Sequence, residues 1–196
     1  KRQSLYGLEI HPGTSFFHDQ QIREMQSERS DLERELYLQA LHKTASMSLI
    51  QYEVSNFAKA DFQSRSNLKV WDGQPYLGLG CGAHSFDGVN RWGNVRSMRK
   101  YMESVEREEP PRDFMETPTR LQQASERLML SLRRPEGLNI LSWQEEFQIG
   151  LSLEQKNQME KLKDQDLVSW ESPILKLTTE GMLLADAITA ELMPEA

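Results

Sequence analysis

The most informative stretch of the sequence is Tyr76-Leu77-Gly78-Leu79-Gly80-Cys81-Gly82-Ala83-His84-Ser85, in which an apolar, strand-like start runs into a glycine-rich turn that ends on a histidine. Glycine has no Cβ, takes positive φ without strain, and lets the backbone approach another group closely. Bare backbone N–H groups in such a loop bind anions. The alternate glycines therefore predict a loop that lies against a ligand, and a tight turn between a strand and a loop is the alternative.

The spacing of these glycines excludes a dinucleotide-binding loop. Gly78, Gly80 and Gly82 follow the pattern G-x-G-x-G. The dinucleotide fingerprint is G-x-G-x-x-G, opens a helix, and is followed at a distance by an acidic residue that binds the ribose. The sequence has no such helix and acidic residue after the run.

Composition narrows the class of protein. The chain has 196 residues and a net charge of −7, so it lacks the excess of Lys and Arg with which nucleic-acid-binding proteins neutralise phosphates. No apolar run approaches the roughly 20 residues that span a bilayer. The single cysteine, Cys81, excludes an internal disulfide framework and supplies too few thiolates for an iron–sulfur cluster. Because the sequence begins at Lys1 without an initiator methionine, it is interpreted as a fragment.

The first half of the sequence predicts strands that alternate with helices, as in βα units. Short apolar runs predict three strands, at 5–10, 49–54 and 76–79. The polar stretch 56–75 is too long for a simple connection and is therefore a candidate binding loop.

Two helices are predicted in the same half. The first begins at the capping box Ser30-Asp31-Leu32-Glu33, and the second spans residues 97–107. The apolar side chains predicted to face inward are Leu32, Leu36, Ala40 and Met47 for the first helix and Met98, Tyr101, Met102 and Val105 for the second.

Paired prolines mark a boundary in the second half. Pro110 and Pro111 lack the N–H that a helix or sheet requires, so residues 110–116 are predicted to form an exposed linker. Thr117 is then predicted to cap a helix that has Pro118 in its first turn and ends at 133. The other predicted elements are helices over 140–147, 153–162 and 178–193 and a hairpin of strands 167–170 and 174–177. Three helices followed by a hairpin is a winged-helix-like order.

Two further stretches, Tyr52-Glu53-Val54-Ser55-Asn56-Phe57-Ala58 and Arg91-Trp92-Gly93-Asn94-Val95-Arg96-Ser97, complete a pattern with residues 76–85. The pattern resembles the C-terminal half of HemW-type radical SAM heme chaperones, which are related to oxygen-independent coproporphyrinogen III oxidase. The resemblance covers nearly the whole chain, up to Leu177-Thr178-Thr179-Glu180-Gly181. It implies an α/β fold, with the terminal βα units of a radical SAM partial barrel over 1–109, a linker at 110–116 and a winged-helix-like domain over 117–196.

The resemblance also implies a site. In this family the glycine loop lies where S-adenosylmethionine and the porphyrin-like substrate meet, which makes Gly80, Gly82, Ala83 and His84 pocket-lining candidates. His84 is further considered as a heme iron ligand, with a structural histidine as the alternative. Cys81 is interpreted as a small buried hydrophobe, with a thiolate ligand as the alternative.

A second implied site precedes the glycine loop. The family motif H-N-x-x-Y-W, a suspected heme-binding motif, is matched here by Asn67 and Trp71, whereas Ser66 replaces the histidine and Val70 the tyrosine.

Other polar and aromatic residues are placed more loosely. Arginines suit bidentate binding of heme propionates or of a SAM carboxylate, and solvated loop arginines are the alternative. Aromatic rings pack against a flat macrocycle or fill a core. The residues considered are Arg65, Arg91, Arg96, Tyr52, Trp71 and Trp92, together with the carboxylate of Glu53 at a predicted strand end.

The resemblance implies that an intact family member holds a [4Fe-4S] cluster, S-adenosylmethionine and heme. This chain lacks the cluster motif C-x-x-x-C-x-x-C, so it is not a radical SAM enzyme by itself. The expected function is binding of heme and its delivery to a heme-accepting protein, in the cytoplasm or an organelle matrix, with dimerisation left open. The alternatives are a coproporphyrinogen III oxidase-like enzyme and a protein- or DNA-interaction module. Residues 117–196 carry 8 Lys and Arg against 13 Asp and Glu, which argues against DNA.

Overall fold

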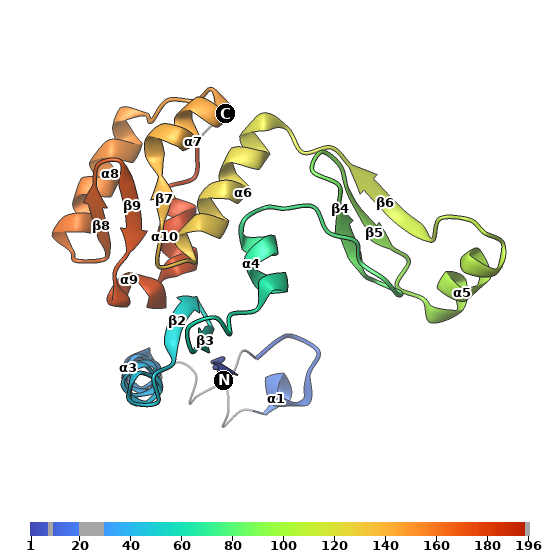
Figure 1. Ribbon diagram of the computed structural model, residues 1–196, viewed down its shortest axis with the longest axis horizontal. Coiled ribbons are helices and arrows are strands. Elements are labelled where there is room, and N and C mark those ends of the chain that lie inside the picture. The colour runs from blue at the N-terminus through green and yellow to red at the C-terminus, as the bar shows by residue number, and fades with distance from the viewer. Residues whose placement is uncertain (8–9, 20–29, 195–196) are drawn as a thin grey trace. The chain divides into compact units, whose positions relative to one another are not determined.

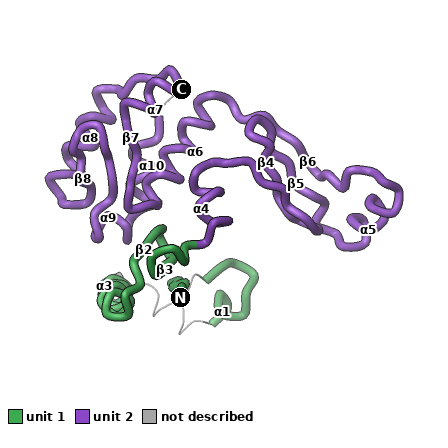
Figure 2. Tube along the Cα trace, in the orientation of Figure 1, with its two compact units in different colours: residues 1–63 green, residues 64–196 purple. Residues whose placement is uncertain are grey.

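The computed structural model describes residues 1–7, 10–19 and 30–194 and has the predicted mixed α/β character (Figure 1). The chain separates into two compact units, residues 1–63 and 64–196, and each is described by itself (Figure 2). The predicted domain limits at residues 109 and 117 stay a prediction.

The first unit is built on a small antiparallel sheet in the order β1-β3-β2. The strands are β1 (Arg2–Ser4), β2 (Ile50–Glu53) and β3 (Asn56–Ala58). The predicted strand at 5–10 is wrong, because the pairing with β3 ends at Ser4; its positions 8 and 9 lie outside the described residues. The strand predicted at 49–54 is confirmed as β2.

The helices of this unit are α1 (Ser15–His18) and α3 (Ser30–Ser46). The second confirms the helix predicted from Ser30, although the Ser30 side chain of the proposed capping box lies outside the described part. Its predicted inward face is not buried: about half of the side-chain surface of Leu32 and Leu36 is exposed. The apolar core of the unit lies instead in the sheet and the residue before it, at Leu49, Tyr52, Phe57 and Ala58.

The stretch 56–75 is not the long loop that its polarity predicts. It contains β3 and a helix, α4 (Arg65–Trp71), which belongs to the second unit. The Ser64 hydroxyl accepts a hydrogen bond from the Asn67 N–H and so caps the first turn of α4, which explains how a polar sequence begins a helix here.

A second antiparallel sheet has the order β4-β5-β6, formed by β4 (His84–Phe86), β5 (Arg91–Asn94) and β6 (Arg112–Glu116). The predicted linker 110–116 therefore supplies a strand, because its two prolines precede the paired residues. The strand predicted at 76–79 is wrong, since only Tyr76 pairs, with Phe86, as an isolated bridge. Every strand pair among the described residues is antiparallel, so the parallel pairing expected of βα units is not formed among them.

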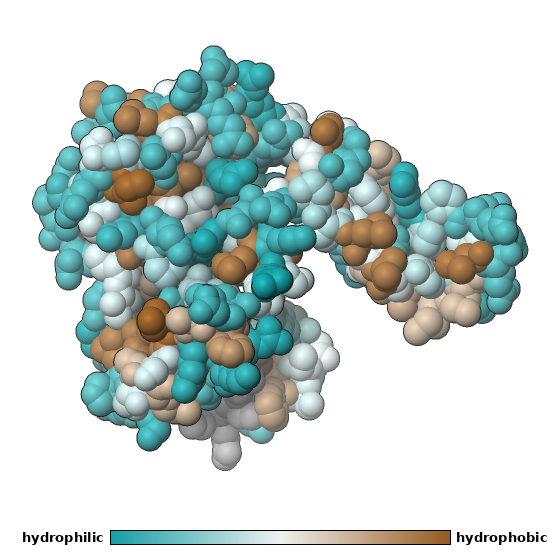
Figure 3. Space-filling model, viewed as in Figure 1, coloured by the Kyte–Doolittle hydropathy of each residue, from teal (hydrophilic) through white to brown (hydrophobic). Residues whose placement is uncertain are grey.

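This sheet and helix α5 (Met98–Glu106) have no apolar core of their own. Between Tyr76 and Glu116 the buried residues are Ser85, Gly93 and Asn94, none of which carries an apolar side chain. The helix predicted over 97–107 is confirmed as α5, with Ser97 as its N-cap. Its predicted inward face is wrong for Met98, Met102 and Val105, which are exposed. Figure 3 shows hydrophobic residues on the surface of this part of the chain.

The well-packed core of the second unit lies in residues 120–192. A sheet in the order β7-β9-β8 packs with the helices around it, and Trp143, Leu132, Met159, Leu175 and Ile188 are its largest buried apolar residues. The elements are α6 (Arg120–Leu132), β7 (Leu138–Asn139), α7 (Ile140–Phe147), α8 (Leu153–Asp164), β8 (Val168–Glu171), β9 (Ile174–Leu177), α9 (Thr179–Leu183) and α10 (Ala185–Glu191).

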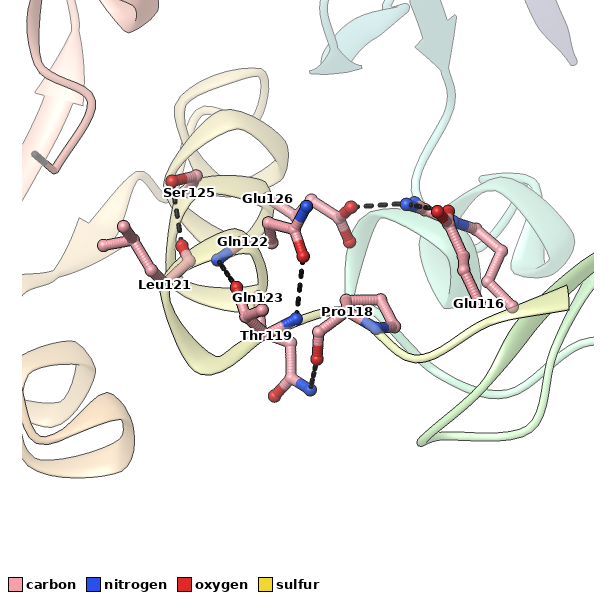
Figure 4. Close-up of polar contacts among 9 residues, drawn as sticks. Glu116, Pro118, Thr119, Leu121, Gln122, Gln123, Ser125 and Glu126 are labelled. Atoms are coloured by element: carbon pink, nitrogen blue, oxygen red, sulfur yellow. Dashed lines mark hydrogen bonds and ion pairs between the residues drawn. The ribbon is translucent and has the colours of Figure 1, made fainter. Parts of the chain in front are cut away.

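Most predictions for this region are confirmed, including α7, α8 and the hairpin of β8 and β9. Two are corrected. The N-cap of α6 is Thr119 rather than Thr117, because Thr119 and Gln122 form the reciprocal capping box (Figure 4). The helix predicted over 178–193 is two helices, separated at Leu184. The winged-helix-like classification stays a prediction.

Candidate functional site

In the loop that precedes β4, the N–H groups of the three glycines donate to other groups of the chain. The Gly78 N–H donates to the Ser85 hydroxyl at 2.9 Å, and the Gly80 N–H donates to the Tyr101 hydroxyl of α5 at 3.1 Å. The Gly82 N–H donates to the Val95 carbonyl at 3.0 Å. Because these three donors are already used within the chain, the glycine N–H groups are not free for an anion.

The glycines are required by the shape of the loop itself. Gly80 and Gly82 have φ values of +103° and +69°, which glycine takes without strain. At Gly78 a Cβ would lie 2.1 Å from the carbonyl oxygen of His84. The close approach predicted from the glycines is therefore an approach to the chain's own backbone, which favours the tight-turn interpretation. The roles of Gly80, Gly82 and Ala83 in lining a ligand pocket stay predictions.

Asn94 fastens this loop to β5. Its side-chain amide donates to the Gly80 carbonyl at 2.9 Å and to the Gly78 carbonyl at 3.4 Å, and its backbone N–H donates to the Ala83 carbonyl at 2.9 Å. The side chain is buried, and a buried amide group with partners of this kind rigidifies its surroundings. Sequence reasoning assigned Asn94 no role, because its partners lie in a different segment.

His84 is the chemically versatile residue that the loop presents. Its side chain is exposed at the start of β4, and no hydrogen bond to its imidazole occurs within the described ranges 1–7, 10–19 and 30–194. Its ring lies against that of Phe114, with ring centroids 5.5 Å apart and an interplanar angle of 62°. A neutral imidazole with unused nitrogens is able to ligate a metal or transfer a proton.

Arg91 is held by two carboxylates of the chain. Its guanidinium lies 2.7 Å from Glu116 at the end of β6 and 2.7 Å from Glu126 of α6. Burial lowers the pKa of Arg91, but hydrogen bonds and charge from Glu116 and Glu126 outweigh it, so the net pKa is raised. Arg91 therefore joins β5 to α6 and is not a free partner for a propionate.

The other predicted cations differ in their surroundings. Arg65 and Arg96 are exposed, and a Cβ at Gly82 would contact the Arg96 side chain at 3.8 Å. The guanidinium of Arg112 lies over the ring of Trp92, 4.8 Å from its centroid, and the predicted contact of Trp92 with a macrocycle stays a prediction.

Asn67 and Trp71, which match the second family motif, lie in a helix whose hydrogen bonds and ion pairs do not involve the glycine loop. The Asn67 side chain accepts a hydrogen bond from Ser64 at 3.0 Å, within the N-terminal turn of α4. Trp71 is half-buried at the end of α4, and the next residue, Asp72, accepts a hydrogen bond from Arg127 of α6 and forms an ion pair with Arg134. Figure 1 likewise shows α4 beside α6. The hydrogen bonds described here join the loop to β5 and α5, and α4 to the region of α6.

Glu53 and Tyr52 lie in the first unit and are buried. The Glu53 carboxylate accepts hydrogen bonds from the side chain of Asn56 and from the Ser55 N–H, and Asn56 in turn accepts one from Ser4. These donors are neutral and satisfy the carboxylate at the junction of β2 and β3. Tyr52 belongs to the core of the unit, as the second interpretation of the aromatic residues predicts.

Metal and membrane features are limited in the described part of the chain. No group of three or more His, Cys, Asp and Glu side chains that would hold a metal ion occurs among the described residues. Cys81 is free and half-buried, so the residues present do not fit an iron–sulfur cluster. Helices of the described ranges are too short or too polar to cross a bilayer.

Known proteins from bacteria and animals match nearly the whole of this chain. Over 193 residues the chain is 30% identical to the heme chaperone HemW of Bacillus subtilis. The alignment covers 98% of this chain and 51% of that protein. The chain is 29% identical over 210 residues to the mitochondrial radical S-adenosyl methionine domain-containing protein 1 of Mus musculus, covering 98% of this chain and 46% of the relative. No family model matches.

A solved structure shows the same fold. The chain matches coproporphyrinogen III oxidase (HemN) of Escherichia coli, a radical SAM enzyme, with a TM-score of 0.64 and 16% identity over 80% of this chain and 39% of that chain. At this identity the likeness concerns the fold alone. The chain spans about half the length of the curated relatives it matches.

Proposed function

We propose that this chain, which is the C-terminal HemW-like portion of a radical SAM protein, binds heme and passes it to a partner protein. The curated relatives named heme chaperone HemW align with nearly all of this chain, which supports a role in heme handling. In this proposal the protein acts in the cytoplasm or in an organelle matrix, and its partners are heme or another porphyrin and a heme-accepting protein.

The single observation that carries the proposal is the setting of His84. The imidazole is exposed, free of hydrogen bonds to the described residues, and packed beside an aromatic ring. Heme iron is commonly held by a histidine nitrogen, and aromatic side chains pack well against a flat apolar macrocycle. His84 would therefore hold the iron, and Phe114 would lie beside the porphyrin ligand.

The cluster and S-adenosylmethionine belong, in this proposal, to the portion of the intact protein that the relatives have beyond this chain. One cysteine does not supply the thiolates of a [4Fe-4S] cluster. Heme binding by this chain therefore has to rest on its own residues, and no radical step is assigned to them.

A heme titration followed by Soret absorbance tests the proposal. Saturable binding is expected for the wild-type chain, with a Kd raised at least ten-fold and an altered Soret maximum in His84→Ala. His42→Ala is the matched control, because His42 is an exposed histidine on α3. Absence of saturable binding by the wild-type chain would refute a heme site at His84. The same Kd in His84→Ala as in His42→Ala would refute it as well. Consumption of coproporphyrinogen by the intact protein in the presence of S-adenosylmethionine would instead favour the oxidase alternative.

A further inference from the structure

We infer that Phe114 is a positioning residue for His84, which it contacts across the gap left by Gly93, and that this contact fixes the imidazole for binding an iron porphyrin. The inference rests on the proposed heme function and assigns a role to two residues, Gly93 and Phe114, that sequence reasoning left without one.

The strand register places the three residues in one row across the sheet. His84 of β4 pairs with Gly93 of β5, and Gly93 pairs with Phe114 of β6. Residues directly opposite one another in an antiparallel sheet project from the same face. Neighbouring strands are about 4.8 Å apart, so the backbones of His84 and Phe114 are separated by about twice that distance.

Gly93 is what allows the two rings to meet over this separation. A Cβ at position 93 would lie 2.4 Å from Cε1 of Phe114, so any side chain there would displace the phenyl ring. With glycine in place, the ring lies over the middle strand and its centroid comes to 5.5 Å from that of His84. An isolated glycine in a strand often marks such a close approach.

The contact is not explained by the filling of a core. Phe114 is 40% exposed, and the buried residues between Tyr76 and Glu116 carry no apolar side chain. The interplanar angle of 62° gives the edge-to-face arrangement that aromatic pairs favour. No hydrogen bond from the described residues holds the imidazole, so the contact with the Phe114 ring is what restrains it there.

Restraint of the imidazole matters for a ligand-binding role. A side chain that is already ordered loses less rotational freedom when it binds, so its ligand binds more tightly. The ring contact leaves the imidazole nitrogens without hydrogen bonds to the described residues and therefore available to a metal. Phe114 thus acts through His84, whatever additional contact it makes with the macrocycle.

Three substitutions in the full chain test the inference. Phe114→Leu removes the aromatic ring, Gly93→Ala displaces it, and Phe114→Tyr retains it. Met115→Leu is the matched control, because Met115 is the neighbouring exposed residue and pairs with Trp92 in the next row. Far-ultraviolet circular dichroism of each variant verifies that the fold is retained.

Two readouts are made on each protein. The first is the proton chemical shift of the His84 ring in the heme-free protein, which senses the neighbouring aromatic ring; the second is the Kd for heme. Phe114→Leu and Gly93→Ala are expected to shift the His84 resonances and to raise the Kd about three- to ten-fold. Phe114→Tyr and Met115→Leu are expected to leave both readouts near the wild-type values.

The two proposals fail in different ways. If the His84 resonances move in Phe114→Leu and Gly93→Ala while the Kd for heme stays constant, the positioning role is overturned and the heme site at His84 stands. Unchanged resonances in both variants overturn the contact itself. If the wild-type chain binds no heme, or His84→Ala binds it equally well, the proposed function fails and the ligand-directed role of Phe114 fails with it, whatever the resonances show.

Discussion

The hydroxyl of Tyr101 in α5 accepts a hydrogen bond from the backbone N–H of Gly80 at 3.1 Å, across a sequence separation of 21 residues. This bond ties the glycine loop to a helix that has few other buried contacts, since Met98, Met102 and Val105 of the same helix are exposed. The loop and α5 are therefore expected to hold each other in place.

Tyr101→Phe is expected to loosen the loop without unfolding the chain. A typical intramolecular hydrogen bond contributes about 0.5–1.5 kcal/mol, so hydrogen exchange at the Gly80 amide should accelerate about two- to ten-fold. Amide exchange followed by NMR measures this effect. Tyr76→Phe is the control, because the described residues offer its hydroxyl no hydrogen bond. Unchanged exchange at Gly80 in Tyr101→Phe would mean that the bond contributes nothing to the loop.

The glycines of the loop should differ in what they tolerate. Gly78→Ala places a Cβ 2.1 Å from the His84 carbonyl oxygen and is expected to break the backbone hydrogen bonds between Tyr76 and Phe86. Gly80→Ala meets no atom within 4 Å but keeps φ at +103°, which costs about 1–3 kcal/mol of local strain. Amide exchange at Tyr76 and Phe86 separates the two effects.

Gly150→Ala is the control for this pair, because no atom lies within 4 Å of its added Cβ and its φ is not positive. This substitution is expected to stabilise the chain by about 0.4–1 kcal/mol through the unfolded state. Equal protection of Tyr76 and Phe86 in Gly78→Ala and in the wild-type chain would show that the loop relaxes around the added methyl group.

The elements that sequence analysis predicted correctly are those whose signals are local. The helix predicted over 153–162 is α8, which begins at a capping box of Ser152 and Gln155, and the apolar spacing of α6 places Ala124, Leu128 and Leu132 in the core. Caps and helical periodicity depend on residues a few positions apart, so they are visible in one segment of sequence.

The sheet β4-β5-β6 could not be predicted from local signals in the sequence, for physical reasons. Its strands are short, its middle strand contains Gly93, and its third strand follows two prolines that are typical of a linker. Pairing of Arg91 with Glu116 joins segments that are distant in sequence, and nothing in either segment specifies the register.

The same limit applies to the candidate site. His84 was identified because it lies in the glycine run itself, but Phe114 reaches it only through the register of three strands. The isolated glycine at position 93 was the one local signal of a close approach. The predicted site residues Asn67 and Trp71 rest on a family motif. The hydrogen bond of the Asn67 side chain lies at the start of α4, and that of Asp72, next to Trp71, is to α6.

The stability of the turn between β4 and β5 should depend on pH. The Asp87 carboxylate accepts hydrogen bonds from the backbone N–H groups of Asn90 and Val89, which lower its pKa below the ordinary value of 3.8. Since the pKa is lowered on folding, the stabilisation is fully present above the ordinary value and is lost as the pH falls from there through the folded value.

NMR of the backbone amides of Val89 and Asn90 between pH 6 and pH 2 measures this transition. Their resonances are expected to move toward random-coil positions as Asp87 is protonated. Asp87→Asn should remove the acid transition, because an amide side chain does not titrate. A transition of the same size in Asp87→Asn would assign it to another carboxylate.

The core around Trp143 should determine the stability of the second unit. Trp143 is 2% exposed, and its indole N–H donates to the Ala124 carbonyl of α6 at 2.9 Å. Trp143→Ala leaves a cavity and is expected to cost about 3–5 kcal/mol of unfolding free energy. Trp143→Phe mainly loses the hydrogen bond to a buried carbonyl and should cost about 1–3 kcal/mol.

Urea unfolding followed by circular dichroism at 222 nm ranks these variants against Leu153→Ala. Leu153 is 76% exposed at the start of α8, so its truncation should change the unfolding free energy by no more than about 0.5 kcal/mol. Trp143 joins α7 to α6, so Trp143→Ala should lower the urea concentration at which residues 120–192 unfold. The glycine loop is held by β5 and α5 instead, so the Gly80 amide should stay protected from hydrogen exchange in the absence of urea. Loss of protection at Gly80 to the same extent would show that β4-β5-β6 depends on this core, through links such as that of Arg91 to Glu126.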